Sequence, residues 1–252
     1  MKKILAASAL ALCFAPLVHA DFIGIKVGAS VWNQDYDGTV QSGTDSLDLQ
    51  QGLGLSDDTN NVFFASFEHP VPLIPNIALS RAELSINSTH VVDEGFDFDG
   101  VPFPSGSEVT TSADFSHTDL TLYYELLDNW ISLDLGLTLR QFDKGIELSH
   151  RPIADGPIVS SSEDFDDIIP LLFVAAKIEL PLTGLYVSGD INGMGYDGDS
   201  FIDYKVNIGY ETSFGFGIEA GMRSLELDIS NSDTEKADVT IDGGYASIYY
   251  HF

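Results

Sequence analysis

The chain has 252 residues, of which 39 are acidic and 11 are basic, so its formal net charge is −28. This acidity disfavours nucleic acid as a partner, because phosphate groups are bound by clustered lysines and arginines. Disorder along most of the chain is disfavoured too, since hydrophobic residues make up 44% of the composition and aromatic residues 11%. We therefore expect a folded protein whose acidic residues are segregated from its apolar ones.

The amino-terminal segment has the pattern of a secretory signal peptide. Lys2 and Lys3 precede an apolar run, Ile4–Val18, that is too short to span a membrane as a helix. We expect residues 1–20 to be removed, and the loss of the two lysines would change the formal charge from −28 to −30. Cys13 is the only cysteine and lies in this segment, so no disulfide or thiol chemistry is expected.

The rest of the chain alternates between polar and apolar side chains with the period of a β-strand. Trp130–Phe142 alternates most cleanly, with leucines on one face only. Three prolines between His69 and Asn76 cannot take part in ladder pairing and mark a turn. In chain order, the predicted strands are Phe22–Trp32, Val62–Glu68, Ile77–Asn87, a strand ending at Leu126, Trp130–Phe142, Ile169–Leu180, Leu185–Asn192, Phe201–Glu211, Phe216–Ile229 and Ala237–Phe252.

The connections between these strands alternate between long acidic segments and short turns. That asymmetry is typical of outer-membrane β-barrels, whose long loops are extracellular and whose short turns are periplasmic. We predict that residues 21–252 form an all-β, antiparallel, up-and-down transmembrane barrel of ten strands in the cell outer membrane. Eight strands are the alternative, because three of the strands are weakly patterned. A soluble β-sandwich would also alternate, but it would not combine a signal peptide with wide Tyr- and Leu-rich faces and a terminal Phe252.

The segment Glu68–Asn76 (EHPVPLIPN), together with the pair Gly243 and Gly244, resembles a family of small Gram-negative outer-membrane β-barrel proteins characterised by that glycine pair. The likeness covers most of residues 21–252 and is most specific in the proline-rich turn. It implies the barrel fold and the outer-membrane location, and it implies no biochemical activity. For such a barrel we expect a monomer whose partners are outer-membrane lipid, lipopolysaccharide and, through the C-terminal strand, the barrel-insertion machinery.

Four of the predicted strands invert their polarity partway along. In the last strand, Asp242 faces outward and Ile241 inward above the glycine pair, the reverse of the pattern below it, and the strands around Trp32, Phe142 and Leu225 behave alike. We predict that the barrel projects beyond the outer leaflet, with acidic side chains in water and apolar ones inside. The upper lumen is then either packed, as in most small barrels, or a pocket for a small or hydrophobic ligand. The candidate ligand-binding residues are Trp32, Tyr36, Phe142, Leu225, Leu227 and Ile241.

Lower in the lumen, the same alternation points charged side chains inward. The predicted charge network consists of Lys26, Glu125, Asp134, Arg140, Lys177, Asp203, Lys205, Glu219 and Arg223. Buried cations require acidic partners, so we predict a salt-bridged plug with a structural role. A narrow ion or solute channel is the alternative, although a barrel of about ten strands leaves little room for water.

An enzyme is not expected, and no catalytic residue is assigned. A ten-strand barrel that rises above the membrane is similar to the omptin proteases, and His117 and Asp119 share an inward face near Arg140. The acidic pairs that such a protease uses across the barrel are not evident, and no serine-hydrolase or zinc motif occurs. An omptin-like or lipid-modifying enzyme is therefore the remaining alternative.

Acidic loops at Asp93–Asp99, Asp164–Asp167 and Asp197–Asp199 offer oxygen ligands for Ca²⁺ or Mg²⁺. Their spacing matches no EF-hand, so we interpret them as solvated surface charge. No metal site and no cofactor are predicted.

Overall fold

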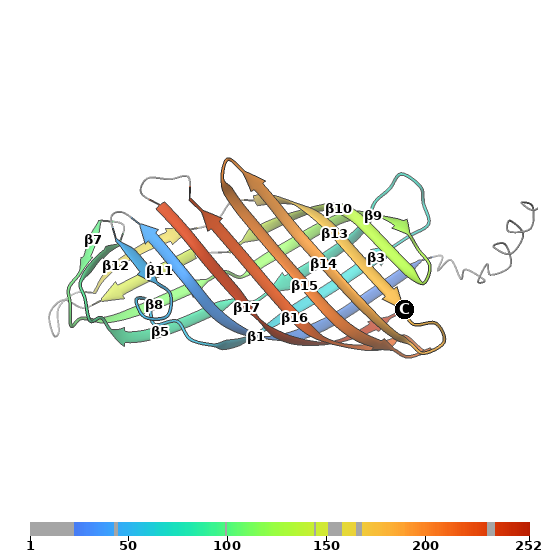
Figure 1. Ribbon diagram of the computed structural model, residues 1–252, viewed down its shortest axis with the longest axis horizontal. Helices are drawn as coiled ribbons and strands as arrows, with labels where there is room; N and C mark the ends of the chain where they lie inside the picture. Colours follow the sequence, from blue (N-terminus) through green and yellow to red (C-terminus); the bar gives the residue numbers. More distant parts are fainter. Residues whose placement is uncertain are drawn as a thin grey trace, which may run out of the picture.

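The computed structural model describes residues 23–42, 45–98, 100–143, 145–150, 158–164, 168–230 and 235–252. The barrel strands are β1 (Gly24–Ser42), β3 (Asp58–Glu68), β4 (Asn76–Ala82), β9 (His117–Leu127), β10 (Ile131–Phe142), β13 (Ile168–Glu179), β14 (Leu185–Tyr196), β15 (Asp199–Glu211), β16 (Phe216–Ile229) and β17 (Glu235–His251). They form one antiparallel sheet that closes by pairing of β17 with β1 (Figure 1). The ten predicted strands are confirmed, and the eight-strand alternative is wrong. The predicted signal peptide lies outside the described residues.

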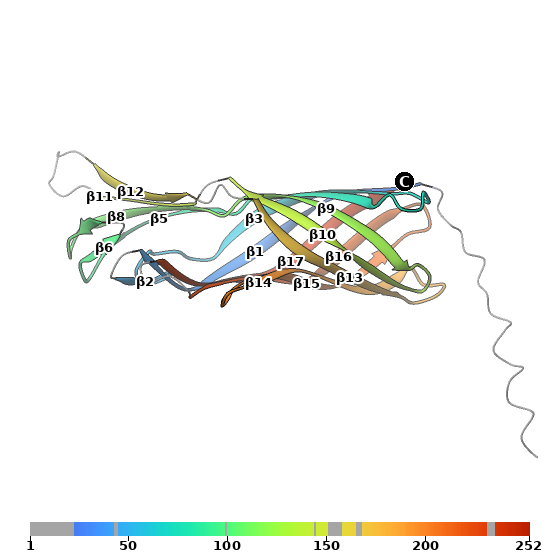
Figure 2. The same cartoon turned by 90° about the horizontal axis from the view of Figure 1, so that it is seen from above.

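Four barrel strands are followed or preceded by strands of a separate sheet that extends beyond the barrel. This extension has the order β12 (Val159–Asp164), β11 (Gly145–His150), β8 (Glu108–Asp114) and β5 (Ser85–Val91). The hairpin of β6 (Phe96–Phe98) and β7 (Val101–Phe103) and the short strand β2 (Ser46–Asp48), which pairs with β1, complete this region. Figure 2 shows the extension at the end of the barrel opposite the C-terminus. We call this end the loop end and the other the turn end.

The strand bounds differ from the prediction in several places. β1 continues to Ser42 instead of ending at Trp32, because its upper half pairs with β17 as far as Glu235. The predicted strand Ile77–Asn87 is divided into β4 and β5, and the connection expected after it contains β6 and β7. Long-range pairing therefore orders acidic segments whose local sequence is typical of loops.

The outer face of the barrel carries an apolar belt on its turn-end half. Its exposed side chains include Val27, Leu137, Val206, Ile208 and Ile248, which are between 40% and 64% exposed. A closed barrel can expose such a belt only where lipid replaces water, so this face is suited to the hydrocarbon layer.

Among the described residues, no helix is long and apolar enough to cross a membrane.

Towards the loop end the polarity inverts, as predicted. Trp32, Tyr36 and Ile241 point inward and are at most 1% exposed, whereas Asp35 and Asp242 face outward as a direct cross-strand pair of β1 and β17. Inward side chains of the upper barrel, the extension and the β2 region form one hydrophobic cluster. The main hydrophobic core therefore lies above the belt.

Gly243 and Gly244 lie at the level where β17 leaves the belt. Trp32 pairs with Tyr245 and Asp35 with Asp242, so β1 and β17 keep one register across an interruption of the ladder at the glycine pair. The inversion of polarity is thus a change of environment and not the result of a bulge. Gly243 has a φ of 151°, and a Cβ at this position would collide with the backbone oxygen of Asn33.

Gly243→Ala is expected to lower the free energy of unfolding by about 2 kcal/mol or more, because the added methyl group must displace β1. Gly244→Ala is the matched control, since the nearest atom to its added Cβ, the Gly221 oxygen, is 3.9 Å away. Its effect is expected within about 0.5 kcal/mol. Urea unfolding in lipid vesicles measures both, and equal effects would contradict a special role for Gly243.

Candidate functional site

A layer of buried charged side chains crosses the lumen at the upper edge of the belt. Arg140 on β10 donates from Nε and Nη2 to the carboxylate of Asp119 on β9, at 2.8 and 2.6 Å. Its Nη2 also donates to Asp203 on β15, at 2.7 Å. Arg223 on β16 donates to the two Asp203 oxygens from Nε and Nη2, at 2.9 and 2.7 Å. These four residues, which we call the charge layer, join β9 and β10 to β15 and β16 across the lumen.

The charge layer is buried and balanced. The side chains of Arg140 and Asp203 are 1% and 5% exposed, and the two arginines face two aspartates. Buried charges are tolerated only when each has a partner of opposite charge. Removing one of the four residues would therefore leave another without its partner and destabilise the whole layer. One donor, Nη1 of Arg140, has no hydrogen-bond partner among the described residues.

Aromatic rings cover the charge layer. The guanidinium carbon of Arg223 lies 4.5 Å from the ring centroid of Trp32, and that of Arg140 lies 5.2 Å from Phe201. Such cation–π contacts add to the ion pairs because the surroundings are desolvated. Both rings belong to the hydrophobic cluster, so the charge layer borders the apolar core directly.

His117 lies beside the charge layer and is not at an accessible rim. Its Nδ1 lies 2.9 Å from the Phe115 carbonyl oxygen, its Nε2 lies 3.5 Å from Nη2 of Arg223, and its ring packs on Phe142. The residue is 0% exposed. Asp119, its supposed catalytic companion, serves as the partner of Arg140. Asp119 could have been assigned to the charge network from sequence, because it shares the inward parity of His117.

The six predicted ligand-binding residues lie in the hydrophobic cluster above the charge layer. Trp32, Tyr36, Phe142, Leu225 and Ile241 are at most 8% exposed, and Leu227 packs at the edge of the cluster. The Tyr36 hydroxyl donates to Oε1 of Gln34 at 2.9 Å, and burial raises the pKa of the Tyr36 phenol. The structure thus brings all six together, packed among themselves and their neighbours. Ligand binding by them remains a prediction.

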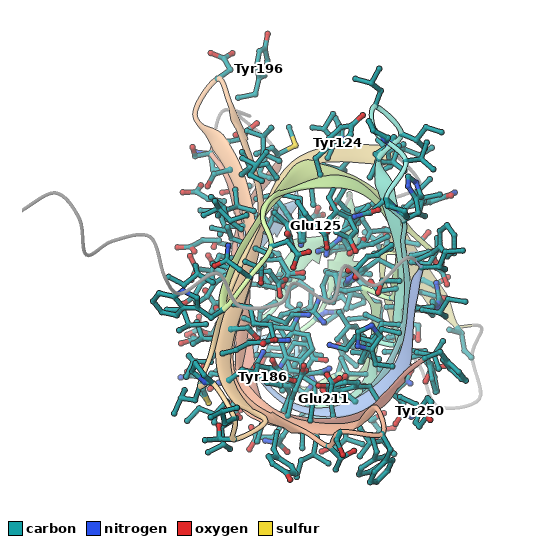
Figure 3. The ribbon with its side chains drawn as sticks, turned by 90° about the vertical axis from the view of Figure 1, so that its right-hand side faces the viewer. Tyr124, Glu125, Tyr186, Tyr196, Glu211 and Tyr250 are labelled. Atoms are coloured by element: carbon teal, nitrogen blue, oxygen red, sulfur yellow. The ribbon has the colours of Figure 1, made fainter. Side chains whose placement is uncertain are left out.

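The remaining charged residues form separate groups towards the turn end. Lys205 pairs with Asp190 at 3.2 Å, and Lys26 pairs with Glu219 at 3.3 Å. Figure 3 looks into this end and shows Glu125, Tyr186 and Glu211 in the lumen, with Tyr250 outside. Hydrogen bonds of 2.6 to 2.8 Å connect Glu219, Tyr186, Tyr249 and Glu211 in that order.

Three predicted network residues stand apart from these pairs. Lys177 pairs with Glu179 at 2.6 Å, where Glu179 is half exposed. Glu125 and Asp134 face each other across β9 and β10, and neither forms a salt bridge with a described basic residue. The sequence therefore identified inward-facing charges, but the single predicted network is divided into the charge layer and several smaller groups.

Within the described ranges, no group of three or more His, Cys, Asp or Glu side chains is arranged to hold a metal ion. Asp166 and Asp167, from one of the acidic loops, lie outside those ranges.

Arg140→Met is expected to lower the free energy of unfolding by about 3–5 kcal/mol, because it leaves Asp119 buried without its cation and Asp203 with one cation fewer. Arg81→Met is the control. Arg81 pairs with Asp143 on the outer face, where both side chains are more than a third exposed, so about 0–1 kcal/mol is expected. Denaturant titrations followed by tryptophan fluorescence compare the two. A similar loss for both variants would contradict the importance of the layer.

No family model and no curated protein matches this sequence. Among solved structures, the outer-membrane protease OmpT of Escherichia coli is similar over 91% of this chain and 97% of its own, with 11% identity and a TM-score of 0.53. Neisserial surface protein A is more distant, with 10% identity and a TM-score of 0.34 over 90% of this chain and 97% of its own. Ail of Yersinia pestis is also more distant, with 12% identity and a TM-score of 0.32 over 91% of this chain and 99% of its own. Identities this low compare folds only. The closed sheet, its apolar belt and this likeness together show the fold of an integral outer-membrane β-barrel protein.

Proposed function

We propose that this protein is a sealed outer-membrane barrel with a structural role, which anchors a folded extension above the membrane and conducts no solute. The charge layer carries this proposal. It connects strands on opposite sides of the lumen, and its two arginines and two aspartates are bonded to one another with side chains at most 12% exposed.

A channel would need a continuous path of water through the same lumen. A permeating ion would have to separate Arg140 from Asp203, and breaking a buried pair costs about 3–5 kcal/mol. It would then have to pass the apolar cluster around Trp32, which offers no polar replacement for a hydration shell. Both barriers favour a closed barrel over a narrow ion or solute channel.

The packing of the upper lumen also favours the structural role over a hydrophobic-ligand site. Small barrels fill their interior with side chains. The six candidate residues already bury their apolar surface against one another and their neighbours in the hydrophobic cluster. A ligand would have to displace well-packed rings such as Trp32 and Tyr36, which are 0% and 1% exposed.

An enzymatic role receives less support. His117 has no access to solvent, and its neighbour Asp119 is occupied by Arg140. The likeness to a protease is a likeness of fold, and one fold carries many functions.

We also infer that the chain belongs to the small barrel family characterised by a C-terminal glycine pair. The close approach of Gly243 to β1 supports this, because it gives that position a structural reason to be glycine. The closed sheet leaves neither β1 nor β17 with a free edge in the barrel, which supports a monomer. Outer-membrane lipid, lipopolysaccharide and the barrel-insertion machinery remain the proposed partners.

In planar lipid bilayers the protein is expected to give no stable conductance steps. Replacing Asp119, Arg140, Asp203 and Arg223 together by alanine removes the layer without leaving one of its charges unpaired, and transient openings are expected from this variant. Arg81→Ala, on the outer face, should remain as silent as the parent protein. A stable open state of the parent would overturn the sealed-barrel proposal.

The Trp32 fluorescence of a Trp130→Phe variant tests the ligand alternative, because Trp32 is then the only tryptophan. We expect a blue-shifted emission that does not respond to added fatty acid or detergent, since the ring is fully buried. A saturable change in emission on titration would instead favour a pocket in the upper lumen.

A further inference from the structure

Two leucines at the turn end adopt a backbone conformation that leucine rarely takes. Leu73, between β3 and β4, has a φ of 71°, and Leu182, between β13 and β14, has a φ of 67°. Each follows a proline, Pro72 or Pro181, and proline followed by positive φ is typical of a type II turn, where glycine or asparagine is preferred. The 3.2 Å bond from the Thr183 amide to the Leu180 carbonyl closes the second of these turns.

Neither leucine side chain is buried against the rest of the described structure. Leu73 is 91% exposed and Leu182 is 107% exposed. The third non-glycine residue with a positive φ in the described ranges is Asp197, on the β14–β15 turn at the loop end, where the side chain is polar as turn chemistry predicts. The turn end therefore carries two strained positions occupied by apolar side chains, and no contact with another described residue explains them.

Both turns are held rigidly. The Tyr124 hydroxyl donates to the Leu73 carbonyl at 2.9 Å, and the His69 amide donates to Asn76 at 3.0 Å. In the other turn, the Thr183 hydroxyl donates to the Leu180 carbonyl at 2.7 Å. The leucines are thus presented outward by fixed backbones, so contact with an apolar medium would cost little additional ordering of the chain.

The surroundings of the two tips are continuous with the lipid-facing belt. Tyr124, which holds the first turn, is itself 46% exposed on the outer face, and Leu180 and Leu185 flank the second tip at 46% and 42%. Figure 1 shows the β3–β4 turn flaring away from the barrel wall at the turn end. Because β9 and β10 separate β4 from β13, the tips stand apart around the rim. A lipid surface surrounds the whole rim, whereas one protein partner would have to span that gap.

We propose that Leu73 and Leu182 are membrane anchors, which insert into the phospholipid interface at the turn end and fix the depth of the barrel in the bilayer. Their apolar side chains extend the belt beyond the last ladder pairs of the strands. The lipid contact offsets the backbone strain at each tip, which explains leucine at positions that favour glycine or asparagine.

Tryptophan placed at each tip tests the depth directly. Leu73→Trp and Leu182→Trp are made in the Trp130→Phe background, and Asp128→Trp, on the exposed β9–β10 turn between them, is the control. Trp32 contributes a constant signal because it is shielded from lipid. In vesicles of phosphatidylcholine brominated on its acyl chains, we expect the tip tryptophans to lose most of their emission relative to unbrominated vesicles. The Asp128→Trp signal should be quenched mainly by aqueous acrylamide. Aqueous quenching of all three alike would overturn the proposal.

Leu73→Asn and Leu182→Asn separate lipid contact from turn strain, because asparagine tolerates positive φ better than leucine. If the leucines are anchors, each replacement lowers the folding equilibrium constant in phosphatidylcholine vesicles by about three- to tenfold, despite the relaxed turn. An unchanged or increased constant would mean that lipid contributes nothing at these tips, and it would overturn the proposal.

Discussion

The removal of two arginines and two aspartates from water is the constraint on which the rest of this structure depends. Arg140 and Arg223 share Asp203, and Arg140 also holds Asp119, so strands distant in sequence meet at one balanced cluster. A charge isolated in this interior would cost several kcal/mol, but bonded charges are tolerated and fix the relative position of the strands that bear them. The charge layer therefore crosses the lumen and links its walls at one level.

This layer separates two interiors of different chemistry. Towards the turn end, the outside is apolar and the inside carries polar groups such as Lys205 and Asp190, as expected of a barrel surrounded by lipid. Towards the loop end, the outside carries Asp35 and Asp242 and the inside is a hydrophobic core. The upper half thus follows the rules of a soluble β-protein, and the lower half follows those of a membrane protein.

The same division explains where the chain tolerates unusual local geometry. Gly243 lies at the boundary, where β17 approaches the Asn33 carbonyl too closely for any side chain. Leu73 and Leu182 lie at the turn end, where a strained backbone carries an exposed leucine. The neighbouring strand explains why residue 243 is glycine, and the proposed lipid contact explains why residues 73 and 182 are leucine. Local backbone propensity alone explains neither choice.

The sequence by itself determined the number of strands, the faces they present and the inversion of polarity, because a period of two directly reports which side chains face inward. It identified Arg140, Asp203 and Arg223 as inward charges and grouped Trp32 with Ile241. It could not decide that Asp119 bonds to Arg140, that Glu125 and Asp134 form no salt bridge with the basic residues that the structure describes, or that β1 continues to Ser42. Those outcomes depend on which strands become neighbours and at what register, and only the closed tertiary structure sets those distances.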